Sequence, residues 1–137
     1  MSAPALEIRV LPPCEILIVE DEPMTAMLLS KEVKARGHEV RGPFRDPVKA
    51  CDAIREHEPD AALLDVSLEN GANSETVARL LNDSGIPFAF VTGYGPETAG
   101  IVRCYPDSLV IPKPVSEETL AMILHELLPP KAAAIGC

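Results

Sequence analysis

The sequence has no tryptophan, and its aromatic residues are two tyrosines and three phenylalanines. Base-stacking surfaces need exposed aromatic rings, and binding to duplex nucleic acid or anionic lipid needs clustered Lys and Arg. Basic residues are also few, because 12 Lys and Arg stand against 21 Asp and Glu, which gives a net charge of −9. The sequence therefore predicts neither a nucleic-acid partner nor a membrane partner.

Paired cysteines and long apolar runs are absent as well. The four cysteines are widely separated and none forms a C-x-x-C pair, which disfavours a zinc site or a redox motif. Glu7 and Arg9 interrupt the N-terminal apolar residues, so no signal peptide is predicted. No apolar run approaches the about 20 residues that span a bilayer. We expect reduced thiols in a cytoplasmic protein.

The length and composition are typical of one globular domain, with 137 residues of which 47% are hydrophobic and 24% charged. Residues 1–13 contain three prolines and no clear period, so they are expected to form an N-terminal extension. The domain is expected at 14–128. Residues 129–137 follow Leu128 and are expected to form a C-terminal tail.

Short apolar runs alternate with helix signals along this domain. Strands are expected at 16–19, 38–44, 61–64, 87–91 and 108–111. The helices between and after them are marked by Pro23, Asp46-Pro47, Val77 with Leu81, Pro96 and Ser116. This order predicts an α/β fold with a doubly wound, five-stranded parallel sheet, helices on both faces and flavodoxin-like topology.

Two of the expected helices have particular features. In the first, Met24 and Met27 fall at helical spacing and are expected to pack on the helix face toward the core. The fourth is expected to be short or irregular, because Gly100 within it costs about 1 kcal/mol relative to Ala.

Charged and hydroxyl side chains follow the expected strands. Glu20 and Asp21 follow the first, Asp65 the third, Thr92 the fourth and Lys113 the fifth. The carboxyl ends of parallel strands meet at one edge of the sheet, so these side chains are expected to converge. Two unit charges 4 Å apart interact by about 4 kcal/mol at an effective dielectric near 20. A divalent hard cation would offset the excess of carboxylates, and all-oxygen ligands suit Mg²⁺, with Mn²⁺ as an alternative.

Such an edge can perform phosphoryl transfer. An Asp between a metal and a Lys can attack phosphorus and form an acyl phosphate, and it needs no general base because it is already ionised at neutral pH. Lys113 and the metal would neutralise phosphoryl oxygens, and Thr92 could donate a hydrogen bond to one of them. Neither a G-x-S-x-G elbow nor a glycine-rich phosphate loop is present.

Four short motifs carry a resemblance to a known family. They are Val19-Glu20-Asp21-Glu22, Leu63-Leu64-Asp65, Val91-Thr92-Gly93-Tyr94-Gly95 and Pro112-Lys113-Pro114. In this order, each at an expected strand end, they resemble the response-regulator receiver domain of two-component signalling over about residues 14–128. The stretch 87–95 further resembles the stand-alone receivers named for an F-A-T-G-U-Y-like motif.

The resemblance implies a role for each matching residue. Asp65 would be the phosphoacceptor, and Thr92 and Lys113 would bind the phosphoryl group. The implied metal ligands are Asp21, Asp65, the backbone carbonyl of Ser67, and Glu20 through water. The Lys113–Pro114 bond resembles one that is usually cis in the family.

The sequence departs from the family at the position three residues before the lysine, where many receivers have an aromatic switch residue. Val110 occupies this position. Tyr94, two residues beyond Thr92, is the candidate to respond to phosphorylation instead or to shield the acyl phosphate from water. Together with the short fourth helix, this puts in doubt dimerisation through the usual face.

The function implied is that of a stand-alone response regulator. It would accept a phosphoryl group on Asp65 from a histidine kinase or phosphotransfer protein, and signal by contact with an unknown downstream protein or by onward transfer. It would catalyse only its own phosphorylation and dephosphorylation, and so is not a metabolic enzyme.

Three alternatives stay open at this point. A metal-dependent aspartyl phosphohydrolase of the haloacid-dehalogenase type needs an acid where Ser67 stands. A flavodoxin-like carrier needs a phosphate-cradling loop where Glu20, Asp21 and Glu22 stand. A pseudo-receiver that binds partners without phosphorylation is the hardest to exclude.

Overall fold

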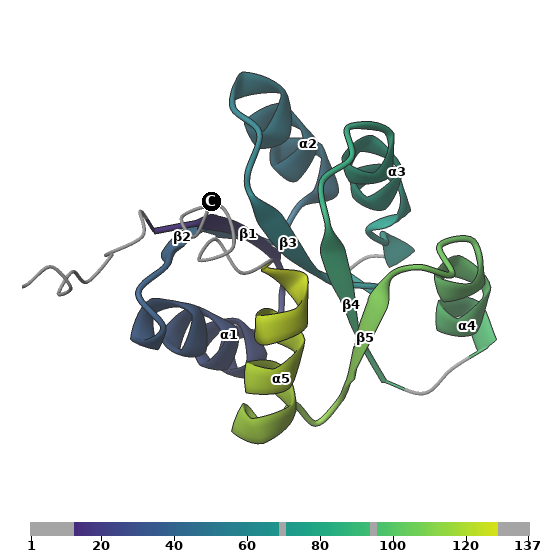
Figure 1. The fold of residues 1–137 in the computed structure, drawn as a ribbon. Helices are drawn as coiled ribbons and strands as arrows, with labels where there is room; N and C mark the ends of the chain where they lie inside the picture. The colour runs from purple at the N-terminus through teal and green to yellow at the C-terminus, as the bar shows by residue number, and fades with distance from the viewer. Residues whose placement is uncertain (1–12, 69–70, 94–95, 129–137) are drawn as a thin grey trace, which may run out of the picture.

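The computed structural model describes residues 13–68, 71–93 and 96–128, which form five strands and five helices (Figure 1). The strands are β1 (Glu15–Val19), β2 (Glu39–Phe44), β3 (Ala61–Asp65), β4 (Phe88–Thr92) and β5 (Leu109–Pro112). The helices are α1 (Pro23–Ala35), α2 (Pro47–Glu56), α3 (Glu75–Asp83), α4 (Pro96–Arg103) and α5 (Glu117–Leu127). No helix within these described ranges is long and apolar enough to cross a membrane.

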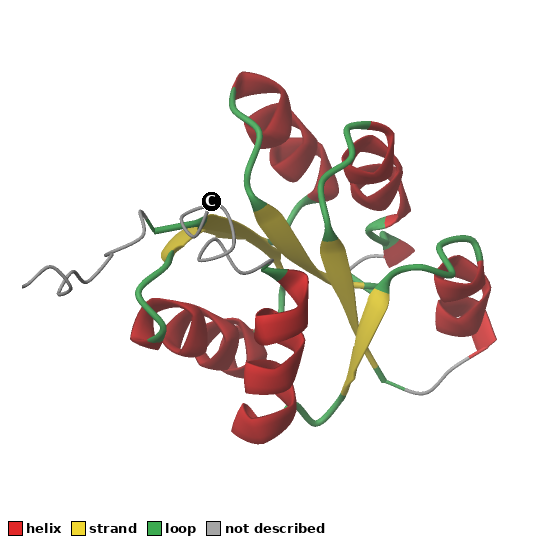
Figure 2. Cartoon of the chain, in the orientation of Figure 1, coloured by secondary structure: helices red, strands yellow, loops and turns green. Residues whose placement is uncertain are grey.

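The five strands form one sheet in the order β2-β1-β3-β4-β5, and every neighbouring pair is parallel. Helices α1 and α5 cover one face, and α2 and α3 cover the other, with α4 beside β5 (Figure 2). The chain leaves β1 toward one edge and then returns to β3, so the strand order reverses between β1 and β3. The predicted fold class and topology are confirmed, and the carboxyl ends of β1 and β3 lie at this switch point.

Alternate strand residues supply two cores, one on each face of the sheet. On β1, Ile16 and Ile18 face the α1 and α5 side, whereas Leu17 and Val19 face the α2 and α3 side. All four side chains are fully buried. Burial on both faces explains why the strand sequences are continuous apolar runs rather than alternating ones.

Local signals set the starts of two helices as predicted. The Asp46 carboxylate accepts a hydrogen bond from the Val48 amide at 2.8 Å, and Ser116 Oγ accepts one from the Thr119 amide at 3.1 Å. Both contacts satisfy amides that lack a partner within the helix. Helix α4 is short, with 8 residues, also as predicted.

The prediction for Met24 and Met27 was wrong. Their side chains are 72% and 64% exposed, while Leu29 and Val33 are the buried residues of α1. A helix turns about 100° per residue, so the two methionines lie on the side opposite Leu29 and Val33. The helix therefore carries an exposed apolar side at its N-terminal end.

Candidate functional site

The first part of the site is Glu20, which directly follows β1. Its amide donates a hydrogen bond to the Phe44 carbonyl at 2.9 Å, which ties it to the end of β2. Gly42 in β2 has φ +101°, and a Cβ there would lie 2.9 Å from the Ile18 carbonyl and 2.7 Å from the Phe44 amide nitrogen. Only glycine fits this close approach without strain. Gly42 therefore helps to set the backbone of Glu20.

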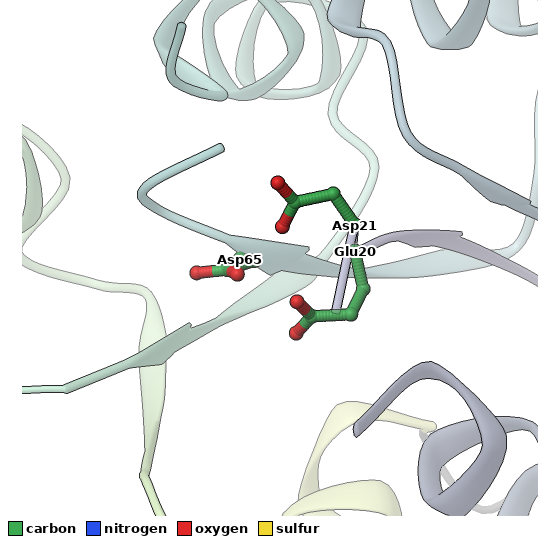
Figure 3. A group of neighbouring side chains, drawn as sticks. All are labelled: Glu20, Asp21 and Asp65. Carbon is green, nitrogen blue, oxygen red and sulfur yellow. The ribbon is translucent and has the colours of Figure 1, made fainter. Parts of the chain in front are cut away.

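Three carboxylates gather beyond β1 and β3. The strands pair with Val19 opposite Leu64, so Glu20, which follows β1, lies beside Asp65, the last residue of β3. Carboxylate oxygens of Glu20, Asp21 and Asp65 lie within 4.8 Å of one another, and Figure 3 shows the three groups converging. Glu20 is 1% exposed and Asp65 4% exposed. The predicted convergence of these three residues is what the fold produces.

Lys113 enters the same group from the end of β5. Its Nζ donates to Asp65 Oδ2 at 2.9 Å and lies 3.5 Å from Glu20 Oε1. Burial alone would lower the pKa of Lys113, but the hydrogen bond and the charges of Asp65 and Glu20 raise it above its ordinary value. The Lys113–Pro114 peptide bond is cis, as expected, and Gly42–Pro43 is also cis. Lys113 is thus a fixed cation against the central carboxylate.

The carboxylates outnumber this one cation, and Glu20 shows the consequence. Burial, followed by the hydrogen bond and the charge of Asp65, raises the pKa of Glu20 to about 8. Its Oε2 accepts from the Glu22 amide at 3.1 Å, whereas its buried Oε1 has no hydrogen-bond partner. A buried carboxylate oxygen that has no hydrogen bond and pairs with Lys113 only at 3.5 Å, in an all-oxygen donor set, fits a hard divalent cation such as Mg²⁺.

The remaining predicted residues come from the β3 and β4 ends. The Ser67 amide donates to Asp65 Oδ1 at 3.2 Å, and Ser67 pairs with Asn73 in an isolated antiparallel bridge. Thr92 is half-buried, and its hydroxyl donates to the Gly93 carbonyl at 2.9 Å. Ser67 therefore contacts Asp65 through a hydrogen bond from its amide. The Thr92 hydroxyl, by contrast, would have to rotate away from Gly93 to donate to a phosphoryl group on Asp65. Tyr94 lies outside the described residues.

The comparison with known proteins agrees with this geometry. Residues 16–125 match the family model of the response regulator receiver domain. The chain belongs to this family. Receiver domains are the signalling modules of response regulators in two-component systems rather than metabolic enzymes, and they generally use Mg²⁺. They interact with histidine kinases or phosphotransfer proteins and with downstream proteins.

Response regulators from several bacteria are similar to this receiver domain. The chain is 32% identical over 116 residues to the phyllosphere-induced regulator PhyR of Methylorubrum extorquens, covering 83% of this chain and 43% of PhyR. The solution structure of SdrG from Sphingomonas melonis is 32% identical, with a TM-score of 0.75, and covers 88% of this chain and 100% of SdrG. The response regulator PhyR from Brucella abortus is 26% identical, with a TM-score of 0.74, over 90% of this chain and 51% of that one. The receiver domain thus spans about half, or less, of the length of these two PhyR proteins.

One departure of this receiver domain concerns the position before the lysine. Val110 is 37% exposed on β5, so no aromatic ring occupies that place. Sequence reasoning gave no role to Tyr105 or Glu75, which meet across the α2 and α3 side through a 3.1 Å hydrogen bond. No motif includes either residue. The one signal in the sequence is Asn73, whose side chain can accept a hydrogen bond from the amide two residues later, at Glu75, and so order the start of α3.

Proposed function

We propose that this receiver domain accepts a phosphoryl group on Asp65 from a histidine kinase or histidine phosphotransfer protein, in a reaction that requires Mg²⁺. It then signals as a stand-alone regulator, by protein contact or onward transfer. The observation that carries the proposal is the buried Asp65 carboxylate, held by Lys113 at 2.9 Å beside two further carboxylates.

The proposed metal ligands are Asp21, Asp65 and the backbone carbonyl of Ser67, with Glu20 acting through water. Bound Mg²⁺, or Mn²⁺, would supply positive charge that offsets the phosphoryl oxygens and the excess of carboxylates. The buried Oε1 atom of Glu20, which lacks a hydrogen-bond partner, supports a cation at this place.

The chain's own residues perform the transfer. A carboxylate oxygen of Asp65 forms a bond to phosphorus while the bond from phosphorus to the donor histidine nitrogen breaks, and the electron pair returns to the imidazole. Lys113 orients the carboxylate and then pairs with phosphoryl oxygens. The Thr92 hydroxyl turns from the Gly93 carbonyl to donate to one of these oxygens. Tyr94 is proposed as the residue that responds to the new group or shields it from water.

The donor is proposed to dock on the N-terminal half of α1 and the adjoining strand-end loops. Met24 and Met27 are exposed there, within a few residues of Glu20 and Asp21. Flexible, apolar methionine side chains suit a protein contact that must form and release. We propose a cytoplasmic location for the domain, residues 14–128, in keeping with the unpaired cysteines 14, 51 and 104.

Incubation with acetyl phosphate and Mg²⁺, followed by intact-mass measurement, tests the proposal. We expect one added phosphoryl group on the wild-type chain, no addition with excess EDTA, and no addition to Asp65→Asn. A wild-type chain that gains no group would instead behave as a non-phosphorylated binding module. Equal modification of Asp65→Asn would show that the acceptor lies elsewhere.

A further inference from the structure

Tyr105 lies in the connection between α4 and β5 and touches two elements that lead to the site. Its ring packs at an angle against Phe88 and Phe90 of β4, with centroid distances of 5.7 and 5.9 Å. Its hydroxyl donates to Glu75 Oε2 at 3.1 Å, at the first residue of α3. One side chain thus joins the strand that ends in Thr92 to the helix that follows the acceptor segment.

Glu75 is connected to the acceptor by further hydrogen bonds. Its amide donates to Asn73 Oδ1 at 2.9 Å, and Asn73 pairs with Ser67 in the isolated bridge. The Ser67 amide donates to Asp65 Oδ1 at 3.2 Å. The hydrogen bonds of this bridge are made by the residues on either side of Ser67 and Asn73, so hydrogen bonds and short stretches of chain together link the Tyr105 hydroxyl to the Asp65 carboxylate.

The described parts of the connection between Asp65 and α3, residues 66–68 and 71–74, are hydrogen-bonded to each other. The Leu68 amide donates to the Ala72 carbonyl at 2.9 Å, and the Ser74 amide donates to the Val66 carbonyl at 3.2 Å. Ser74, the last residue of this connection, directly precedes Glu75, the first residue of α3. A restraint on Glu75 can therefore reach Ser67 through the hydrogen bonds that join residues 66–68 to residues 72–74.

The Glu75 carboxylate is itself held from two directions. Arg79 Nη2 binds its two oxygens at 2.9 and 3.2 Å, one helical turn along α3. Burial, then the hydrogen bond to Glu75, raises the pKa of Tyr105, so its hydroxyl keeps the proton that it donates. Arg79 is 65% exposed, and exposed ion pairs contribute little, so Tyr105 is the restraint from the interior.

We propose that Tyr105 and Glu75 are positioning residues that hold residues 66–68 and 71–74, and with them the Ser67 carbonyl, in place for the metal. The consequence for the metal rests on the proposed function. The restraint on the segment does not. This contact joins the α4 to β5 connection to the acceptor segment in a chain whose position 110 has no aromatic side chain.

The test compares Tyr105→Phe with Ser108→Ala in the full chain. Tyr105→Phe keeps the ring against Phe88 and Phe90 but removes the hydroxyl. Ser108→Ala is the matched control, because Ser108 Oγ donates to the Tyr105 carbonyl at 2.8 Å in the same connection and has no hydrogen bond to Glu75. In the metal-free chain we expect amide hydrogen exchange at Leu68 and Ser74 to become about 3- to 10-fold faster in Tyr105→Phe only. Unchanged exchange at both amides would overturn the proposed restraint.

A Mg²⁺ titration then tests the consequence for the site. We expect the Kd to rise about 3- to 10-fold in Tyr105→Phe and to stay unchanged in Ser108→Ala. Faster exchange with an unchanged Kd would overturn the positioning role. A wild-type chain that binds no Mg²⁺ would refute the metal part of the proposed function, while hydrogen exchange would still decide the restraint. The double variant Tyr105→Phe/Glu75→Ala should lose no more protection than Glu75→Ala, since additive losses would contradict a direct pair.

Discussion

The two helical layers each lead to one half of the site, and the halves differ. The connections 20–22 and 113–116 lead into α1 and α5, and they hold Glu20, Asp21 and Lys113. The connection 66–74 leads into α3 and contains Ser67. The connection 93–95 leads into α4 and directly follows Thr92. In the first half, charged groups already contact one another. In the second, the Thr92 hydroxyl is bonded to its own neighbour, Gly93.

The charged groups of the first half are already in place, whereas the contacts of the second half can change. Lys113, Glu20 and Asp65 are held by a buried core and by one another, so they need little rearrangement when a phosphoryl group arrives. Ser67 lies in a longer connection that is bridged to Asn73, and we propose that the contact between Glu75 and Tyr105 holds this connection in place. Under the proposed function, the α1 and α5 side would supply most of the electrostatic stabilisation, and the α3 and α4 side would transmit a change at Asp65.

Core substitutions are the strongest test of this comparison. Leu124 of α5 is 1% exposed, whereas Ile101 of α4 is only half-buried. We expect Leu124→Ala to lower the free energy of unfolding by about 3 kcal/mol and Ile101→Ala by about 1 kcal/mol, because the loss scales with the buried volume removed. Urea denaturation measures both. Equal losses would show that α4 is packed as firmly as α5.

Substitutions at Lys113 and Thr92, the two proposed phosphoryl ligands, should differ in the same direction. We expect Lys113→Ala to slow phosphorylation by acetyl phosphate about 100-fold, because it removes a charged donor already in contact with Asp65. Thr92→Ala should slow it only about 10-fold, since a neutral hydroxyl is lost. Initial rates by intact mass give the comparison. A larger effect at Thr92 would reverse the assignment of the two halves.

The pH dependence of stability tests Glu20 in the metal-free chain. The pKa of Glu20 is about 8 in the folded chain and near 4.5 ordinarily, so the folded state binds its proton more tightly. This contribution to stability is present below about pH 4.5 and is lost as the pH rises toward 8. We expect the free energy of unfolding to fall by at most about 1.4 kcal/mol per pH unit over this window.

Glu20→Gln is the matched variant, because it keeps the size of the side chain and cannot titrate. Urea midpoints at pH 5, 6, 7 and 8 should fall for the wild-type chain and fall less for Glu20→Gln. Parallel curves for the two proteins would remove Glu20 as the source.

The smallest expected effect concerns donor docking. We expect Met24→Ser/Met27→Ser to slow transfer from a phosphorylated histidine kinase, chosen for its activity on the wild-type chain, by about 5- to 10-fold. Phosphorylation by acetyl phosphate should be unchanged, because this small donor needs no docking surface. Val48→Ser is the control, since Val48 is 65% exposed on α2 in the other layer. Equal slowing by the control would refute a specific α1 surface.

Much of the fold was predictable because its signals are local. Apolar runs bounded by Pro, Gly or charge indicated the strands, and Asp46 and Ser116 indicated two helix starts through contacts within three residues. The side of α1 that faces the core was not predictable from spacing alone. Met24, Met27, Leu29 and Val33 are all apolar, and only packing against the sheet decides which of them are buried.

The sequence by itself determined which chemical groups end the strands: Glu20, Asp21, Asp65, Thr92 and Lys113. Only the tertiary structure decided how they meet. Strand order brings Glu20 beside Asp65, and burial raises the pKa of Glu20. The contact between Tyr105 and Glu75 joins residues 30 positions apart. Such contacts depend on packing between distant elements, which no local pattern of residues encodes.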